Sequence, residues 1–147
     1  MKTGINLKKA EKELAKTFKE KGLKVRISQD DGCLNVVGSF GVKPYDDEIF
    51  TLFEYYEKGA AVFTFTFDHL EINEQTLRMV NEFNEKNKFF RAFIDSNKKY
   101  LRIQHPLFHL DAAAVVPYTL AVLNYLADKE LQPILGPLCL LSEGDAD

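Results

Sequence analysis

Hydrophobic and polar positions along the chain follow two different periods, and the changes of period mark the predicted elements. Helical spacing of apolar residues predicts three helices, over residues 7–21, 73–87 and 111–129. Alternating or β-rich segments predict six strands. These strands are one around Val25 and Ile27, followed by Cys33–Phe40, Glu48–Glu57, Ala60–Phe67, Phe89–Asp95 and Tyr100–His105.

Polar, glycine and proline residues at the ends of these segments predict where elements start and stop. Asn73 and Asp111 are expected to cap the second and third helices, because their side chains accept hydrogen bonds from the free amides of a first turn. Lys58-Gly59 is a predicted hairpin turn. Pro117 is expected to kink the third helix or to lie in the first turn of its second part. The side chains expected to face inward are Leu7, Leu14 and Phe18 from the first helix, with Ala10 on the flank, and Leu77, Val80 and Phe83 from the second.

The order of the predicted elements, α-β-β-β-β-α-β-β-α, defines the expected fold class. Strands joined by short turns pair antiparallel, so the sequence predicts an α+β fold with one twisted antiparallel sheet and helices packed mainly on one face. We expect a single domain over residues 1–130. A C-terminal tail follows, apolar over residues 131–141 and acidic over residues 142–147.

Two predicted strands are apolar on both faces, more than a sheet covered by one layer of helices needs. The segment 48–57 directs three apolar side chains to each face, Ile49, Phe53 and Tyr55 to one and Phe50, Leu52 and Tyr56 to the other. The segment 89–94 places Phe89 and Phe93 opposite Phe90, Ala92 and Ile94. The sequence therefore predicts a protein-binding patch on the second face, made of Phe50, Leu52, Tyr56, Phe89 and Phe93. The tail 131–141, a second subunit and a partner segment are the candidates to cover it.

The most specific stretch runs from the second predicted helix into the hairpin that follows. It reads Asn81-Glu82-Phe83-Asn84, then Phe89-Phe90-Arg91-Ala92-Phe93-Ile94-Asp95, then Tyr100-Leu101-Arg102-Ile103. This pattern resembles the bacterial YbjN-like domain family over about residues 7–129, with the motif carried by Asn81, Glu82, Asn84, Arg91, Ala92 and Asp95. The resemblance implies a fold like that of type III secretion chaperones, a curved antiparallel sheet flanked by helices, often dimeric. The family is labelled a sensory-transduction regulator, and the label brings no catalytic residue and no ligand.

The two motif asparagines also have a physical interpretation. Asn81 and Asn84 are three residues apart, so they share one face of the second helix. Asn84 is near the helix end, where its amide is expected to hydrogen-bond backbone groups of the loop leading to Phe89. A ligand-binding pair of amides is the alternative.

Composition narrows the class of protein. With 147 residues, 46% hydrophobic and 28% charged, the chain matches an ordinary soluble domain and differs from collagen-like, disordered and disulfide-stapled proteins. It has twelve Phe and six Tyr but only three His and two Cys. The polar N-terminus lacks an apolar signal segment, and the two cysteines are far apart, so we expect a reduced, cytoplasmic protein.

Charge is uneven along the chain. Nine Lys or Arg and three Glu give residues 1–27 a net charge of +6, which leaves −9 for residues 28–147. A basic stripe follows the first predicted helix, made of Lys8, Lys12, Lys16 and Lys19. Glutamates interleave with it, and no aromatic residue lies beside it for base stacking. The sequence therefore predicts a solvated helix face, with no nucleic-acid or membrane partner, those contacts being the alternatives.

The best candidate for a metal or acid–base site is the segment from His105 to Asp111. On a helix, His105 and His109 would face one ion, but Pro106 disfavours helical backbone at His105. We expect a connector between strand and helix. A small metal-dependent enzyme or metal-binding protein using His105, His109 and Asp111 is the alternative.

Other sequence signals of catalysis are absent. The chain has no phosphate-binding glycine loop and no GxSxG turn, and both Cys33 and Cys139 are expected to be inert thiols. The sequence therefore predicts no catalytic residue, no metal and no cofactor. It favours a non-catalytic protein-binding or regulatory domain that pairs with itself or with another protein.

Overall fold

The computed structural model describes residues 4–41, 48–67, 73–95 and 100–126. Its elements are α1 (Leu7–Glu20), β1 (Val25–Asp30), β2 (Cys33–Gly41), β3 (Glu48–Tyr56), β4 (Ala61–Phe67), α2 (Glu74–Lys86), β5 (Arg91–Asp95), β6 (Tyr100–Leu107), the 3-10 helix η1 (Ala112–Ala114) and α3 (Val115–Leu126). The α+β class and the order of elements predicted from the sequence are confirmed.

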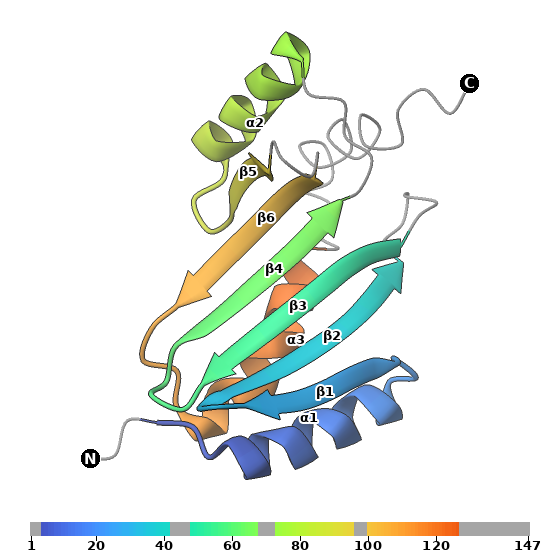
Figure 1. The fold of residues 1–147 in the computed structure, drawn as a ribbon, viewed down its shortest axis with the longest axis vertical. Coiled ribbons are helices and arrows are strands. Elements are labelled where there is room, and N and C mark those ends of the chain that lie inside the picture. The colour runs from blue at the N-terminus through green and yellow to red at the C-terminus, as the bar shows by residue number, and fades with distance from the viewer. Residues whose placement is uncertain (1–3, 42–47, 68–72, 96–99, 127–147) are drawn as a thin grey trace.

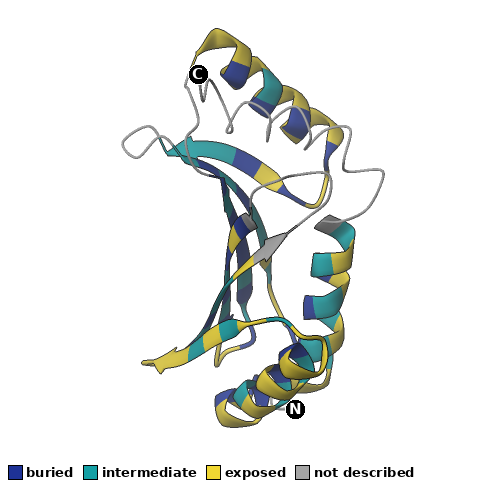
Figure 2. Ribbon diagram, turned by 90° about the vertical axis from the view of Figure 1, so that its right-hand side faces the viewer, coloured by how far each residue is buried: buried dark blue, intermediate teal, exposed yellow. Residues whose placement is uncertain are grey.

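The six strands form one antiparallel sheet in the order β1-β2-β3-β4-β6-β5 (Figure 1). Because β6 pairs with β4, β5 becomes an edge strand, and β1 forms the other edge. Figure 2 shows α1, α2 and α3 on the same side of the sheet. No described helix lies over the opposite side, which faces the viewer in Figure 1. We refer to this side as the helix-free face.

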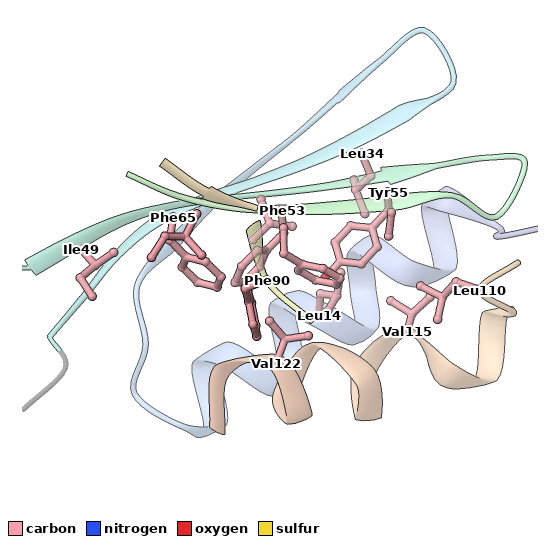
Figure 3. Packing of buried hydrophobic residues seen from close by; sticks show 14 of the residues in the cluster. Leu14, Leu34, Ile49, Phe53, Tyr55, Phe65, Phe90, Leu110, Val115 and Val122 are labelled. Carbon is pink, nitrogen blue, oxygen red and sulfur yellow. The ribbon is translucent and has the colours of Figure 1, made fainter. Parts of the chain in front are cut away.

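The core lies between the helices and the covered face of the sheet (Figure 3). Phe53 is fully buried, and its ring meets those of Phe63 and Phe65 edge to face at centroid distances of 5.1 and 6.0 Å. From α1, the buried side chains are Leu7, Leu14 and Phe18, as predicted, and Ala10 on the flank. The helical period of the sequence therefore located this part of the core correctly.

A polar pair crosses the core between β3 and α3. The Tyr55 and Thr119 hydroxyl oxygens are 2.5 Å apart, and the Thr119 hydroxyl donates to the carbonyl of Val115 at 2.7 Å. Tyr55 is therefore the donor to Thr119. Burial raises the pKa of the Tyr55 phenol, because the charged form loses its hydration.

One inward position on α2 was predicted wrongly. Asn73 caps the helix as expected, accepting from the Thr76 amide at 2.9 Å. The buried residues, however, are Thr76, Val80 and Phe83, whereas Leu77 is 51% exposed. Because α2 packs beside β5 at the edge of the sheet, only a narrow stripe at positions i, i+4 and i+7 is covered.

The hairpin after α2 also differs from prediction at both outer ends. β5 begins at Arg91 rather than Phe89, and β6 continues through Pro106 to Leu107. Along an antiparallel strand, every second residue forms hydrogen bonds to a given neighbouring strand. Pro106 is one of the β6 residues that do not bond to β4, so its nitrogen points towards β5. β5 starts opposite Gln104, so the proline ring removes no ladder hydrogen bond.

The connector between β6 and α3 is tied to the β3–β4 turn. Gly59 has φ +100°, and its carbonyl accepts from the Leu110 amide at 2.7 Å. A Cβ at this position would lie 3.1 Å from the Leu110 carbonyl oxygen, so this close approach favours glycine. Asp111 caps η1 through a 3.0 Å hydrogen bond from Ala114, and Pro117 lies in the first turn of α3, one of the two expected arrangements.

Two predictions fall outside the described residues, namely those for Cys139 and for the tail over residues 131–147. Within the residues that the structure does describe, no helix is both long and apolar enough to cross a membrane.

Candidate functional site

Phe50 and Leu52 lie two residues apart on β3 and point to the helix-free face. Phe50 is 44% exposed, and Leu52 is half-buried. Val37 of β2 lies directly opposite Leu52 and is also half-buried. These three side chains form what we call the apolar centre of the helix-free face. Side chains with hydroxyl groups border it on both neighbouring strands, Ser39 on one side and Thr64 and Thr66 on the other.

Tyr56 lies at the far end of β3, apart from the apolar centre. Glu54 stands between it and Leu52 on the same face, and the Tyr56 hydroxyl donates to Glu54 Oε2 at 2.9 Å. That hydrogen bond raises the pKa of Tyr56 to about 12, with smaller contributions from burial and from the Glu54 charge. Tyr56 therefore belongs to a polar end of the face rather than to one continuous apolar patch.

The two phenylalanines predicted from the β5 region lie elsewhere. Phe93 is on the helix-free face in the same cross-strand row as Phe50, but Thr66 and Arg102 lie between them. Phe89 precedes β5, and its ring is 5.9 Å from that of Tyr125 on α3, on the side that carries the helices. The expectation of one patch of five side chains is thus wrong in its geometry, because only Phe50 and Leu52 are neighbours.

The motif residue Asn84 closes the outer edge of β5. Its Oδ1 accepts from the Ala92 amide at 2.7 Å, and its Nδ2 donates to the Ala92 carbonyl at 3.0 Å. One side-chain amide thus makes both hydrogen bonds that a neighbouring strand would make to Ala92. This geometry assigns Asn84 a structural role in joining helix to strand.

The loop contacts expected of Asn84 are made by Asn87 instead. Asn87 is buried, and its Oδ1 accepts from the amides of Phe89 and Phe90 at 3.0 and 2.7 Å. Its Nδ2 lies 3.5 Å from the Tyr125 hydroxyl. Asn87 was not predicted from the sequence, although its position directly after the helix is a known place for side chains that bond to a following turn.

The other motif residues are not gathered into a site. Asn81 and Arg91 are exposed, and Ala92 is buried. Glu82 forms an ion pair with Lys86 one helical turn away at 2.6 Å, which lowers the pKa of Glu82. Asp95 pairs with Arg102 across β5 and β6 at 3.3 Å. These pairs are typical of local stabilisation within a helix and a hairpin.

His105 is held by both of its ring nitrogens. Nδ1 lies 2.7 Å from the Phe89 carbonyl and therefore carries the proton, and Nε2 accepts from the Tyr118 hydroxyl at 2.5 Å. Its ring also stacks on that of Tyr118, with centroids 5.9 Å apart. Burial raises the pKa of Tyr118, which keeps this phenol a donor.

The alternative metal site is not assembled. His109 is exposed in a connector with φ +62°, and Asp111 is engaged as the cap of η1. Since both ring nitrogens of His105 are occupied, the three side chains cannot act as one ligand set. Across the described ranges, no group of three or more His, Cys, Asp or Glu side chains is placed to hold a metal ion.

His105 contributes to the lining of two hollows. One is apolar, encloses about 220 Å³ and is lined by Phe89, Phe90, His105, Tyr118, Ala121, Val122 and Tyr125. The other is larger, about 1020 Å³, and is lined mainly by polar residues of α2, of the connector between α2 and β5, and of β5 and β6. The aromatic cluster was not predicted from the sequence, although Tyr118 and Tyr125 are seven residues apart and thus share one helix face.

Two further candidates from the sequence are Cys33 and the basic stripe on α1. Cys33 is half-buried on the helix-free face, and its pKa is raised by burial and by the charge of Glu54, so the reactive thiolate is disfavoured. The four lysines of the basic stripe are exposed along α1, as expected for a solvated helix face.

Comparison with known protein families, with curated proteins and with solved structures found no match to this chain.

Proposed function

We propose that this chain is a non-catalytic, YbjN-like domain that binds another protein in the bacterial cytoplasm. Its role in this proposal is regulatory or chaperone-like and resembles that of type III secretion chaperones. Its ligand in this proposal is an apolar segment of a partner protein, which docks on the helix-free face. The observation that carries the proposal is the apolar centre, where Phe50 remains 44% exposed beside Leu52 and Val37.

The surroundings of the apolar centre support protein binding. Protein interfaces combine a small apolar core, often with an aromatic anchor, and a polar rim that excludes water. Here Thr64 and Thr66 on β4 border the apolar centre, and Glu54 lies two positions after Leu52 on β3. An extended or helical segment with two apolar side chains would bury Phe50 and Leu52 together.

The polar groups of the described chain support a non-catalytic role. His105 has both nitrogens in internal hydrogen bonds, and the Tyr55 hydroxyl is bonded inside the core. Asn84 and Asn87, the amides nearest the larger hollow, bond backbone groups. A general base or nucleophile needs a free lone pair facing a substrate, which these groups do not offer.

The test is affinity capture from the native host with the intact chain and two variants. Phe50→Ser/Leu52→Ser removes the apolar centre, whereas Thr66→Ser changes a bordering residue by one methyl group. We expect the same partner to be retained by wild type and by Thr66→Ser and lost from the double variant, whose circular dichroism should match wild type. Equal retention by all three proteins would contradict the proposal.

A further inference from the structure

The two edges of the sheet are finished in different ways. At β5, the side chains of Asn84 and Asn87 bond the backbone of Ala92 and Phe90, so these outward backbone groups are already occupied within the chain. At β1, none of the described residues makes a hydrogen bond to the outer side of the strand. An uncovered strand edge is a template for pairing with another chain.

The register of the β1–β2 hairpin determines which β1 groups point outward. Asp30 and Cys33 flank a two-residue turn and pair with each other. Bonded residues alternate from there, so Ser28 and Arg26 also bond to β2. The backbone groups of Val25, Ile27 and Gln29 therefore point away from the sheet.

The exposed edge strand β1 is complementary to β1 of a second copy of the chain. Arg26, Ser28 and Asp30 are exposed in succession on the helix-free face. An antiparallel pair of β1 strands with its two-fold axis at Ser28 places Arg26 of one copy opposite Asp30 of the other, twice. In the same register Ile27 lies opposite Gln29, so the outward backbone groups of both residues meet as a hydrogen-bonded pair. A shift of the axis to Arg26 would place like charges face to face.

A groove beside β1 adds an apolar contribution. It encloses about 410 Å³ between α1 and β1, and its lining includes Leu23, Val25 and Ile27. These three side chains are only half-buried, although they pack on the core. A second β1 strand laid along this edge would cover them, and its own three counterparts would be covered in return.

We propose that the partner at this edge is a second copy of the chain, joined through β1 in the register centred on Ser28. The two sheets then continue as one, with the apolar centres of both copies on the same side. This inference deepens the proposed function by naming a self-association edge. It uses none of the residues of the apolar centre, so each idea can fail without the other.

Cross-linking tests the register. In a background of Cys33→Ser/Cys139→Ser, Ser28→Cys places two thiols opposite each other in a non-hydrogen-bonded pair, within reach of a disulfide. Ser39→Cys is the matched control, exposed on the same face but on β2. We expect mild oxidation to give a covalent dimer with Ser28→Cys and at least tenfold less with Ser39→Cys. Equal cross-linking of both, or none at Ser28→Cys, would overturn the register.

Sedimentation over a range of protein concentrations tests the contacts. Gln29→Pro removes an outward amide that the monomer does not use, and Gln29→Ala is its control. We expect a wild-type dimer that Gln29→Ala keeps and Gln29→Pro weakens at least tenfold. Arg26→Asp should weaken it similarly, and Arg26→Asp/Asp30→Arg should restore it. A wild-type monomer, or a dimer lost only in Phe50→Ser/Leu52→Ser, would overturn the proposal.

Discussion

The two faces of the sheet receive side chains from the same strands but serve different ends. On β3, Phe53 and Tyr55 point to the covered face and are fully buried, whereas Phe50 and Tyr56 point to the other and remain 44% and 36% exposed. The exposure of the two faces differs because the layer formed by α1 and α3 covers one face only (Figure 2). Similar aromatic residues one position apart therefore contribute to stability on one face and remain available for contact on the other.

The largest expected effect is a difference in the free energy of unfolding between substitutions on the two faces of the sheet. Phe53→Ala should lower the free energy of unfolding by about 3–5 kcal/mol, because it leaves a cavity among packed rings. Phe50→Ala should change it by only about 0.5 kcal/mol, as is usual for surface positions. Urea denaturation followed by circular dichroism measures both. Equal losses would mean that Phe50 belongs to the core.

The comparison of edges predicts the next effect. Asn84→Ala should cost about 1–3 kcal/mol, since the Ala92 amide and carbonyl lose their partner. Asn81→Ala, on the same helix face and likewise exposed, leaves both hydrogen bonds to Ala92 in place, so this control should cost under about 0.5 kcal/mol. Hydrogen exchange should quicken at the Ala92 amide in Asn84→Ala alone. An unchanged exchange rate would show that Asn84 does not protect this edge.

Two tyrosines on opposite faces offer a smaller contrast. Tyr55→Phe removes the buried hydrogen bond to Thr119 and should cost about 1 kcal/mol, whereas Tyr56→Phe removes an exposed bond to Glu54 and should cost less. Thermal unfolding of both variants checks the order. If Tyr56→Phe were the more damaging change, the assignment of a core face and a surface face would be wrong.

The smallest effect is the alkaline pH dependence of the helix-free face. Because the pKa of Tyr56 is raised from 10.0 to about 12 in the folded protein, its contribution to stability is fully present below pH 10. That contribution is lost as the pH rises towards 12, since the unfolded chain releases the proton first. Tyr56→Phe should therefore lose less stability than wild type between these pH values. In ultraviolet titration, Glu54→Gln should lower the midpoint of Tyr56, and an unchanged midpoint would contradict the hydrogen bond as its cause.

Local patterns predicted the fold better than the site. The period of apolar residues located the elements and the alternation on β3, and polar residues at the ends of segments located the helix caps Asn73 and Asp111. These features could be predicted because they depend on neighbours in sequence. The grouping of Phe89 and Phe93 with Phe50 was wrong for two reasons. Phe89 precedes β5 and contacts Tyr125 on the side that carries the helices, and the distance from Phe93 to Phe50 depends on strand order. Only the crossover that inserts β6 between β4 and β5 moves Phe93 three strands from Phe50.

The role of His105 was also beyond sequence reasoning. Its partners are the Phe89 carbonyl and the Tyr118 hydroxyl, which lie on separate segments that meet only in the folded chain. The sequence predicted a connector between strand and helix here, and a metal site using His105 and His109 was the alternative. That alternative requires a helix, whereas the chain forms a strand end and a connector. Pro106 was the local signal against that helix.

The most direct test of the central claim is photo-cross-linking in the native host. A photoreactive phenylalanine analogue at Phe50 on the helix-free face is compared with the same analogue at Lys12, exposed on α1. We expect a discrete cross-linked product with a partner protein from position 50 and none from position 12. Equal products from both positions, or none from position 50, would contradict a protein-binding role for the helix-free face.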